Sequence, residues 1–323
     1  MLVQFTIEYA AINASVTPAQ VARLLSQWAR FGVLVFPPHS DSRLIQAIES
    51  LPPTQRKIWK KTWQLIVHNN GNAFRRKTNP TLKIDWEKIR DRPALASLDV
   101  HADVAVLGET RANLLGIPDG ESRICGNIEG LRLWDIDASE SFSRANQLAN
   151  DPIRVGDSIR DVWEERFQSV ACHSKTVVVV DAYAARRNNI NGILRLLAFL
   201  DRDANNCPVT LYSSMDPNSP NLQQIRSRIG SAVANFSGGG IAWLQLLLYR
   251  DSDFKMYSHD RHLRFDNSVF RIGRGLRVFE RSNASEASDV ALVTLEPGAR
   301  EQKESDLDSF GVLASRIRML TNK

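Results

Sequence analysis

From residue 175 onward the chain alternates short apolar runs with amphipathic stretches, and no other feature constrains its fold as strongly. The run "KTVVVVDAYA" is rich in β-branched residues and bounded by polar ones, which is typical of a strand buried on both faces. "NINGILRLLAFLDRD" and "NLQQIRSRIGSAVANF" have helical spacing, whereas "CPVTLYSS" and "AWLQLLLYRDS" have strand composition. This alternation predicts βαβ units around a mostly parallel sheet with helices on both faces.

The last part of the chain continues the same pattern. "YSHDRHLRFDNSVFRIGRGLRVF", residues 257–279, is expected to form the next strand and a hairpin, and "DVALVTLEP" one more strand. "LDSFGVLASRIRML" is expected to form a closing helix. We therefore predict an α/β domain over residues 160–323, with a mixed, mostly parallel sheet flanked by helices.

The first half of the chain has its own strand and helix signals. "MLVQFTIEYA" alternates like a strand, and "TPAQVARLLSQWARFG" is a helix that starts at a Thr cap and stops at Gly32. "VLVFPP" is strand-like, and the helical region that follows from about residue 41 is interrupted at Pro52 and Pro53. "VHADVAVLG" and "LRLWDID" are further strand candidates. Residues 138–158 are rich in Ser, Asp and Asn and lack periodicity, which suits a linker after a separate α/β domain in residues 1–150.

Composition limits the compartment and the kinds of partner. The 323 residues hold 41 Lys+Arg and 36 Asp+Glu, for a net charge of +5 and a pI near 9.2, which is compatible with a polyanionic partner. The cysteines, Cys125, Cys172 and Cys207, are widely spaced and form no zinc motif, so we expect a reducing compartment, no metal and no cofactor. The N-terminus lacks the features of a signal peptide, and the longest apolar runs fall short of the roughly 18–20 residues that span a bilayer. The expected location is the cytoplasm.

The densest group of chemically active residues lies within residues 257–279. His259, Arg261 and Asp266 precede a Gly-Arg-Gly-Leu stretch that begins at Gly273, so the spacing is H-x-R-x(4)-D-x(6)-G-R-G-L. In a strand, His259 and Arg261 share one face and His262 lies on the other. A solvated hairpin with Arg-Asp pairs is the alternative interpretation.

This layout resembles the motif of the phospholipase D superfamily, H-x-K-x(4)-D followed by G-S-x-N. It is most similar to the phospholipase D-like C-terminal domain of MIT-domain proteins and of bacterial conflict and phage-defence proteins. The resemblance implies that His259 matches the nucleophile, Arg261 the phosphate-binding lysine and Asp266 the supporting aspartate. Gly273 matches the first residue of the second element. It also implies other defence-system subunits as partners.

Three departures from that motif favour holding a phosphate over cleaving it. Arg261 replaces the lysine, Arg274 replaces the serine and Leu276 replaces the asparagine. Arginine stays charged and recognises phosphate in a bidentate manner. The full H-x-R-x(4)-D motif occurs once in the sequence, whereas the family's chemistry uses a nucleophilic and a protonating histidine. The alternative is therefore a homodimeric, metal-independent phosphodiesterase or nuclease with His259 as nucleophile, or one that uses His262 as the acid.

A basic and aromatic segment in the first half suggests which phosphate is bound. "QRKIWKKTWQ" interleaves positive charges with Trp59 and Trp63, and "FRRK" follows closely. Such a surface can follow a nucleic-acid backbone, so nucleic acid is favoured over an anionic lipid headgroup. The tryptophans are, alternatively, core anchors beneath a solvated face. The candidate nucleic-acid-binding residues are Arg56, Lys57, Lys60, Lys61, Arg75 and Arg76.

Two weaker signals concern strand ends. Glu8, Asp103, Glu109 and Asp135 are candidates for a metal-dependent nuclease site, although their spacing favours surface or capping roles. The residues that follow the valine-rich strand, "DAYAARRNN", are candidates for a pocket near the main motif or for an ordinary helix entrance. The glycines of "FSGGGIAW" precede a strand, so they predict a turn and not a phosphate loop.

Overall fold

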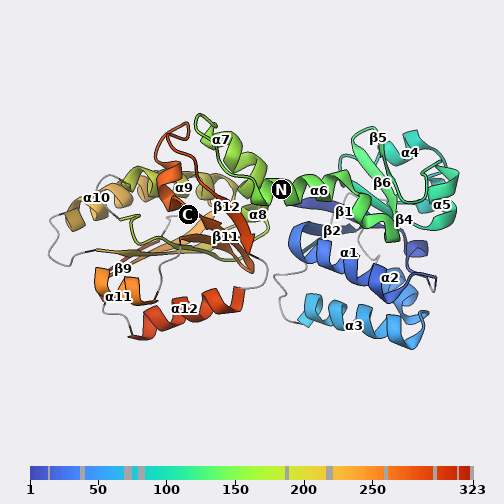
Figure 1. Ribbon diagram of the computed structural model, residues 1–323, viewed down its shortest axis with the longest axis horizontal. Helices are drawn as coiled ribbons and strands as arrows, with labels where there is room; N and C mark the ends of the chain where they lie inside the picture. Colours follow the sequence, from blue (N-terminus) through green and yellow to red (C-terminus); the bar gives the residue numbers. More distant parts are fainter. Residues whose placement is uncertain are drawn as a thin grey trace. The chain divides into compact units, whose positions relative to one another are not determined.

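The computed structural model describes residues 1–13, 15–36, 41–68, 75–78, 84–185, 189–215, 221–257, 261–293, 297–310 and 313–320. They form two compact units (Figure 1), one of Leu2–Gln147 and one of Leu148–Lys323 together with Met1. Each unit contains a mixed sheet flanked by helices, so the predicted α/β class is confirmed.

The N-terminal unit is built on a sheet with the strand order β3-β2-β1-β4-β6-β5. All neighbouring pairs are parallel except β5 with β6. The chain builds outward from β1 to β3 on one side and then crosses to β4 on the other side, so β1 and β4 form the point at which the strand order reverses. The strands are β1 (Val3–Ile7), β2 (Gly32–Phe36), β3 (Arg75–Thr78), β4 (Val104–Leu107), β5 (Ser122–Cys125) and β6 (Ile128–Arg132).

Capping residues and a proline mark the starts of two helices in this unit. Thr17 and Gln20 form a capping box at the first helix, and Pro53 opens the third helix after the predicted interruption. The helices are η1 (Tyr9–Ala11), α1 (Pro18–Phe31), α2 (Asp41–Glu49), α3 (Pro53–His68), η2 (Trp86–Lys88), α4 (Arg92–Ala96), α5 (Glu109–Leu114), η3 (Leu133–Ala138) and α6 (Glu140–Asn150).

Two predictions for the end of this unit were wrong. "LRLWDID" is mainly the 3-10 helix η3, and the expected linker contains helix α6. The buried Glu129 on β6 starts α6, because its carboxylate accepts hydrogen bonds from the Glu140 and Ser141 amides at 2.7 and 3.0 Å and from the Ser139 hydroxyl at 2.8 Å. Ser139 also caps this helix locally, because its hydroxyl accepts a hydrogen bond from the Phe142 amide at 3.2 Å.

The C-terminal unit is built on a sheet with the order β12-β11-β10-β7-β8-β9-β13. Parallel pairing is confined to β7, β8 and β9, whereas β10, β11, β12 and β13 pair antiparallel, so the expected mostly parallel sheet is corrected. The two-residue turn between β10 and β11 is the reason for one antiparallel pair, since parallel strands need a long crossover. The strands are β7 (Val177–Val180), β8 (Cys207–Ser214), β9 (Ile241–Tyr249), β10 (His262–Phe265), β11 (Ser268–Ile272), β12 (Val290–Val293) and β13 (Leu313–Leu320).

The end of the chain contradicts the predicted closing helix. Only residues 307–310 of the predicted segment are helical, as the end of α12 (Pro297–Phe310), and β13 (Leu313–Leu320), which pairs with β9, takes up most of the rest. In β13 the exposed Arg316 and Arg318 flank the buried Ile317, which is the alternation of a strand with one covered face.

Helices cover both faces of this sheet (Figure 1). Helices α11 (Asp251–Tyr257) and α12 lie on one face, and α9 (Ile190–Asp203) and α10 (Asn221–Ala234) lie on the other. Under α11 and α12 the core includes Tyr212, Leu247, Tyr249, Phe254 and Leu307. The remaining helices of this unit are α7 (Ile159–Val162), η4 (Trp163–Phe167), α8 (Gln168–Cys172) and η5 (Gly275–Phe279). No helix in the described part of the chain is both long enough and apolar enough to span a membrane.

Candidate phosphate-binding site

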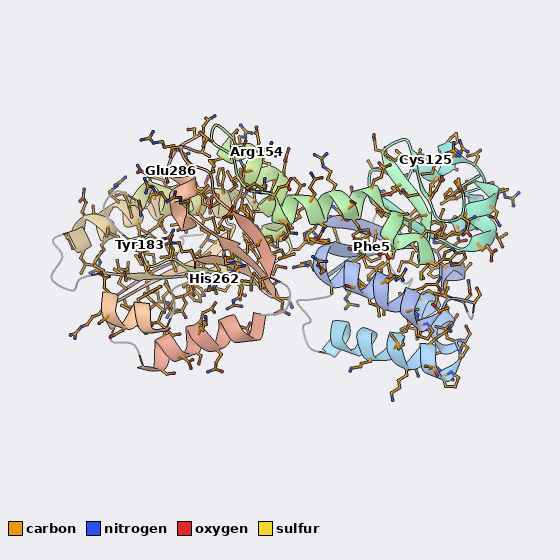
Figure 2. The ribbon with its side chains drawn as sticks, viewed as in Figure 1. Phe5, Cys125, Arg154, Tyr183, His262 and Glu286 are labelled. Carbon is orange, nitrogen blue, oxygen red and sulfur yellow. The ribbon has the colours of Figure 1, made fainter. Side chains whose placement is uncertain are left out.

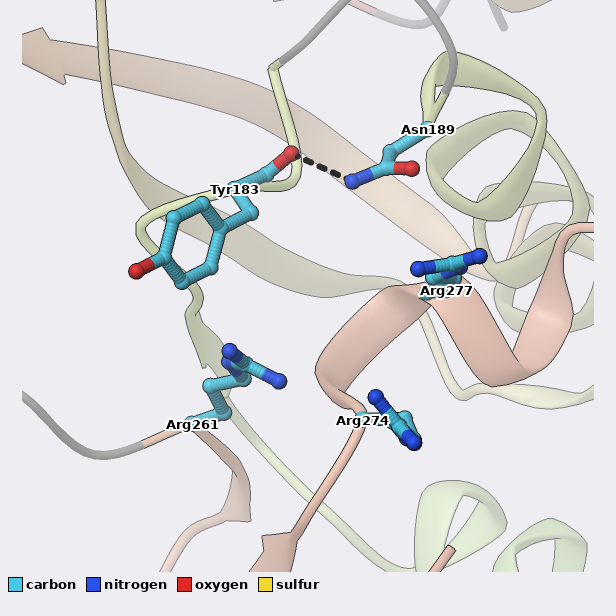
Figure 3. A pocket seen from close by; sticks show the side chains of 5 residues that line it. All are labelled: Tyr183, Asn189, Arg261, Arg274 and Arg277. Atoms are coloured by element: carbon cyan, nitrogen blue, oxygen red, sulfur yellow. Dashed lines mark hydrogen bonds between the residues drawn. The ribbon is translucent and has the colours of Figure 1, made fainter. Parts of the chain in front are cut away.

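Three arginines meet at one pocket of the C-terminal unit. The pocket has a volume of about 210 Å³, and its lining residues are Tyr183, Asn189, Arg261, Arg274 and Arg277 (Figure 3). Strand β10 runs antiparallel to β7, with His262 opposite Val180. The start of β10 and the end of β7 therefore lie side by side at one end of these two strands, although they are far apart in the sequence.

Asp181, which directly follows β7, holds the segments around the pocket together. Its side chain is buried; Oδ1 accepts a hydrogen bond from the Tyr183 amide at 2.9 Å, and Oδ2 accepts one from the Leu276 amide at 2.7 Å. Gly275 approaches so closely that a Cβ atom there would lie 2.1 Å from Oδ2, and its φ of +58° is one that side chains rarely adopt. The second glycine of Gly-Arg-Gly is thus required by Asp181.

Arg261 is held on two sides. Its Nη1 donates a hydrogen bond to the Gly273 carbonyl at 2.7 Å, and its guanidinium carbon lies 4.7 Å from the centre of the Tyr183 ring. The Tyr183 carbonyl in turn accepts a hydrogen bond from Asn189 at 2.9 Å, drawn as the dashed line in Figure 3. A guanidinium fixed by an aromatic ring and a carbonyl is preorganised to receive an anion.

Arg274 and Arg277 share one carboxylate, that of Glu286. Arg274 Nε lies 3.2 Å from Glu286 Oε2, and Arg277 Nη2 lies 2.8 Å from Oε1. Both arginine side chains remain about half exposed, and the terminal nitrogens of Arg274 make no hydrogen bond within the described residues. Among the described residues, the three guanidinium groups at the pocket outnumber the two neighbouring carboxylates, Glu286 and the buried Asp181. The pocket therefore has an excess of positive charge.

The predicted glycine and arginines of the motif have different roles here. Arg261 and Arg274 are brought together as expected. Gly273 does not offer a donor, because its amide donates to the Asp289 carbonyl at 2.9 Å and its own carbonyl accepts from Arg261. Arg277 was not among the predicted site residues. It lies one turn of η5 beyond Arg274, and side chains three apart in a 3-10 helix share a face, so this spacing was the signal that could have found it.

Asp266 does not lie at the pocket, and its predicted place there is corrected. It follows β10 at the end opposite to Arg261, with φ of +50° in the hairpin turn. Its carboxylate accepts hydrogen bonds from the amides of Lys175 and Thr176 at 3.0 to 3.2 Å and from the Thr176 hydroxyl at 3.0 Å. Asp266 thus fixes the start of β7. His259 falls outside the described residues.

His262, labelled in Figure 2, and Arg264 lie on the face of β10 that α12 covers, where both contact Glu304. His262 Nε2 lies 3.3 Å from Glu304 Oε1, and Arg264 forms a two-point ion pair with Glu304 and a contact of 3.0 Å with Glu301. Burial raises the pKa of Glu304, but hydrogen bonds from His262 and Arg264 more than offset this effect, so the pKa is below its usual value. His262 is therefore not available as an acid at the arginine pocket.

The candidate nucleic-acid residues of the N-terminal unit are only partly available. Arg56 and Lys60 pair with Glu49 at 3.7 and 2.7 Å, and Arg75 on β3 is buried. Trp59 is buried as a core anchor, and the side chain of Trp63 lies outside the described residues. The exposed members of the set are Lys57, Lys60, Lys61 and Arg76, of which Lys60 is paired with Glu49.

The four candidate metal-binding carboxylates do not converge. Glu8 follows the carboxyl end of β1, whereas Asp103 precedes the amino end of β4 and accepts a hydrogen bond from the Gln4 amide at 2.7 Å. Asp135 lies in η3, and Glu109 starts α5. Within the described residues, no group of three or more His, Cys, Asp or Glu side chains is arranged to hold a metal ion.

The glycine-rich turn before β9 binds an anion of the chain itself. The amides of Ser237, Gly238 and Gly239 donate to the Asp201 carboxylate at 3.1, 2.8 and 3.1 Å. This arrangement is the turn that the order of glycines and strand predicted, with an internal carboxylate as its occupant. Arg186 and Arg187 lie outside the described residues.

No family model matches the chain, and no curated protein matches its sequence. Among solved structures, the chain is similar to TrmBL2, an archaeal chromatin protein whose structure shows a novel mode of DNA binding, with 12% identity and a TM-score of 0.28 over 50% of this chain and 53% of that one. It is also similar to phosphatidylserine synthase from Haemophilus influenzae Rd KW20, with 12% identity and a TM-score of 0.30 over 57% of this chain and 47% of that one. The chain spans about half the length of either protein. At this level of similarity, neither the fold nor the function of these two proteins is inferred for this chain.

Proposed function

We propose that the C-terminal unit binds a phosphate group of a nucleic acid in the pocket formed by Arg261, Arg274 and Arg277, and that it holds this phosphate without cleaving it. The observation that carries the proposal is the convergence of three guanidinium groups on one pocket of about 210 Å³. Sites that enclose a whole drug-sized ligand measure roughly 300–1,000 Å³, so this pocket suits a single group of a larger ligand.

The chemistry of the lining residues favours a phosphate. Arginine forks bind phosphate oxygens through paired hydrogen bonds and keep their charge at any physiological pH. Helix α9 begins directly after Asn189, a lining residue, so its amino end lies beside the pocket and adds partial positive charge.

Nucleic acid is favoured over a lipid headgroup because Tyr183 lies beside the arginines. An aromatic ring next to a phosphate contact can stack on a base, and such stacking contributes about 1–3 kcal/mol per base. The net charge of +5 favours a polyanion with many phosphates. The role in bacterial phage defence, with other defence-system subunits as partners, is proposed only because the motif resembles that class of protein.

Holding is favoured over cleavage because the motif lacks the polar groups of the active family. Leu276 is buried and supplies only its amide, which Asp181 occupies. His262 lies on the opposite face of β10, so no second histidine of the described residues reaches the pocket. Cleavage would require a homodimer that joins two copies of His259.

The experiment measures binding and cleavage together. Fluorescein-labelled single- and double-stranded DNA and RNA, and anionic vesicles, are titrated with the wild type and with Arg261→Ala, Arg274→Ala and Arg277→Ala. Hydrogen bonds to charged groups contribute about 1.5–3 kcal/mol, so each variant is expected to bind nucleic acid about tenfold more weakly. Arg226→Ala, at an exposed arginine on α10 outside the pocket, is the matched control.

Two outcomes would overturn the proposal. Equal affinity of the pocket variants and the Arg226→Ala control would show that the arginine pocket is not the binding site. Binding to vesicles but not to nucleic acid would show that the ligand is a lipid headgroup. Cleavage that survives EDTA and disappears in His259→Ala would establish the phosphodiesterase alternative, and light scattering would then be expected to show a dimer.

A further inference from the structure

A second pocket lies in the N-terminal unit at the carboxyl ends of β1 and β4. Its volume is about 660 Å³, and its lining includes Glu8, which directly follows β1, and Gly108, which directly follows β4. Loops that leave two neighbouring parallel strands toward opposite faces open a crevice, and ligands of open α/β sheets bind there. The fold therefore places this cavity where a ligand site is expected, and its volume suits a whole small molecule.

A fixed carboxylate forms part of the pocket wall. Glu8 is buried; its Oε2 accepts a hydrogen bond from the Gly108 amide at 2.8 Å, and its Oε1 accepts one from Arg111 Nε at 2.7 Å. Arg111 is itself anchored, because Nη1 donates to the Ile89 carbonyl at 2.6 Å. A carboxylate has about four acceptor positions, so Glu8 can accept further hydrogen bonds from a ligand without moving.

The rest of the lining disfavours anions. Glu8, Glu87 and Glu109 line the pocket together with Arg90 and Arg111, so carboxylates outnumber guanidinium groups. This balance is the reverse of that at the arginine pocket of the other unit. A phosphate or another polyanion would meet the Glu87 and Glu109 carboxylates, which are exposed.

An apolar side chain completes the lining. Leu114 lines the pocket and is 57% exposed, so it offers apolar surface to a ligand. Burial of such a side chain by a ligand ring is favourable by roughly 25 cal/mol per Å². The hydroxyl of Thr110 and the guanidinium of Arg111 lie on the same lining and can donate to ring oxygens.

We infer that this pocket binds an uncharged small molecule with a hydroxyl-bearing ring, of the size of a nucleoside or a simple glycoside. Its hydroxyls donate to Glu8 and accept from Arg111, and its ring lies against Leu114. This inference concerns a different unit from the proposed phosphate site, so either can fail alone.

The test is saturation-transfer NMR and calorimetry on the full chain. The probes are adenosine, guanosine, cytidine, uridine, methyl glucoside and methyl galactoside, and each nucleoside is compared with its 5′-monophosphate. At least one uncharged probe is expected to bind, and a nucleoside that binds is expected to lose affinity several-fold when it is phosphorylated. To keep the arginine pocket from masking this comparison, the monophosphates are also measured on Arg261→Ala.

Variants locate the binding. Leu114→Ser and Thr110→Val are expected to weaken the bound probe about fivefold or more, whereas Ile124→Ser, at a residue of the same unit with the same exposure of 57%, is expected to leave it unchanged. Glu8→Gln is expected to abolish binding. Because this change also disturbs Arg111, the folding of the variant is checked by circular dichroism. If the Glu8→Gln protein is unfolded, the result for Leu114→Ser decides the test. Absence of binding by all six uncharged probes, or equal affinity in Leu114→Ser and Ile124→Ser, would overturn the inference.

Discussion

The Asp181 carboxylate accepts a hydrogen bond from the Leu276 amide at 2.7 Å, although 95 residues separate the two in the sequence. This bond ties the end of β7 to the Gly-Arg-Gly-Leu stretch and thereby brings Arg274 and Arg277 to the side of Arg261. The geometry of the arginine pocket therefore depends on a buried carboxylate that does not itself line it.

Gly275→Ala is expected to destabilise the protein and weaken nucleic-acid binding. The new Cβ would lie 2.1 Å from Asp181 Oδ2, at a residue with φ of +58°. Backbone strain of this kind costs about 1–3 kcal/mol, and the steric contact adds to it. The measurement is the free energy of unfolding in urea. Gly273→Ala is the control, because a Cβ there meets no atom closer than 3.5 Å; equal losses in both variants would contradict the account.

Glu286→Gln is expected to tighten nucleic-acid binding. Glu286 pairs with both Arg274 and Arg277, so removal of its charge leaves two guanidinium groups for the phosphate. A gain of about threefold to tenfold in affinity corresponds to roughly 0.7–1.4 kcal/mol, a magnitude ordinary for a partly exposed ion pair. Glu121→Gln, at an exposed residue of the other unit, controls for net charge alone. Weaker binding by the Glu286 variant would show that this carboxylate positions the arginines and does not compete with the ligand.

Stability is expected to fall in acid through Glu304. The folded-state pKa of Glu304 lies below its ordinary value of 4.5, since hydrogen bonds from His262 and Arg264 outweigh the effect of burial. Its stabilising contribution is therefore fully present above about pH 4.5 and is lost as the pH falls through the lowered pKa. Glu304→Gln is expected to cost about 2 kcal/mol or more at pH 7, because Glu301 is then the only ion-pair partner that Arg264 keeps among the described residues, and to flatten the acid limb of the stability curve. An unchanged acid limb would refute this assignment.

Only Cys172, of the three cysteines, is expected to react with iodoacetamide in the folded protein at neutral pH. Burial raises the pKa of the Cys207 thiol to about 12 and also raises that of Cys125, whereas Cys172 is exposed. Peptide mass spectrometry before and after unfolding in urea locates the label. Rapid labelling of Cys207 under native conditions would contradict the burial of β8.

The elements with strong local signals were predictable from the sequence. The valine run gave β7, the capping residues of α1 marked its start, and strand alternation separated Arg261 from His262. The motif spacing identified Arg261 and Arg274, which the structure brings to one pocket.

Features that depend on distant partners were not predictable. Strand β13 is stabilised by pairing with β9, and Glu129 on β6 supplements the local Ser139 cap of α6. Asp266 belongs to the motif by spacing, yet strand β10 lies between it and Arg261, so Asp266 lies at the opposite end of that strand from the pocket. The pocket beside Glu8 depends on strand order, which a single sequence does not reveal.

The salt dependence of nucleic-acid binding tests the central claim most directly. Each phosphate contact contributes about 0.7–0.9 to the slope of log affinity against log salt concentration. If the three arginines hold a phosphate, the Arg261→Ala, Arg274→Ala and Arg277→Ala variants will each bind more weakly and show a shallower slope than the wild type, and Arg226→Ala will show neither change. Slopes and affinities that are unchanged in all three pocket variants would contradict the account.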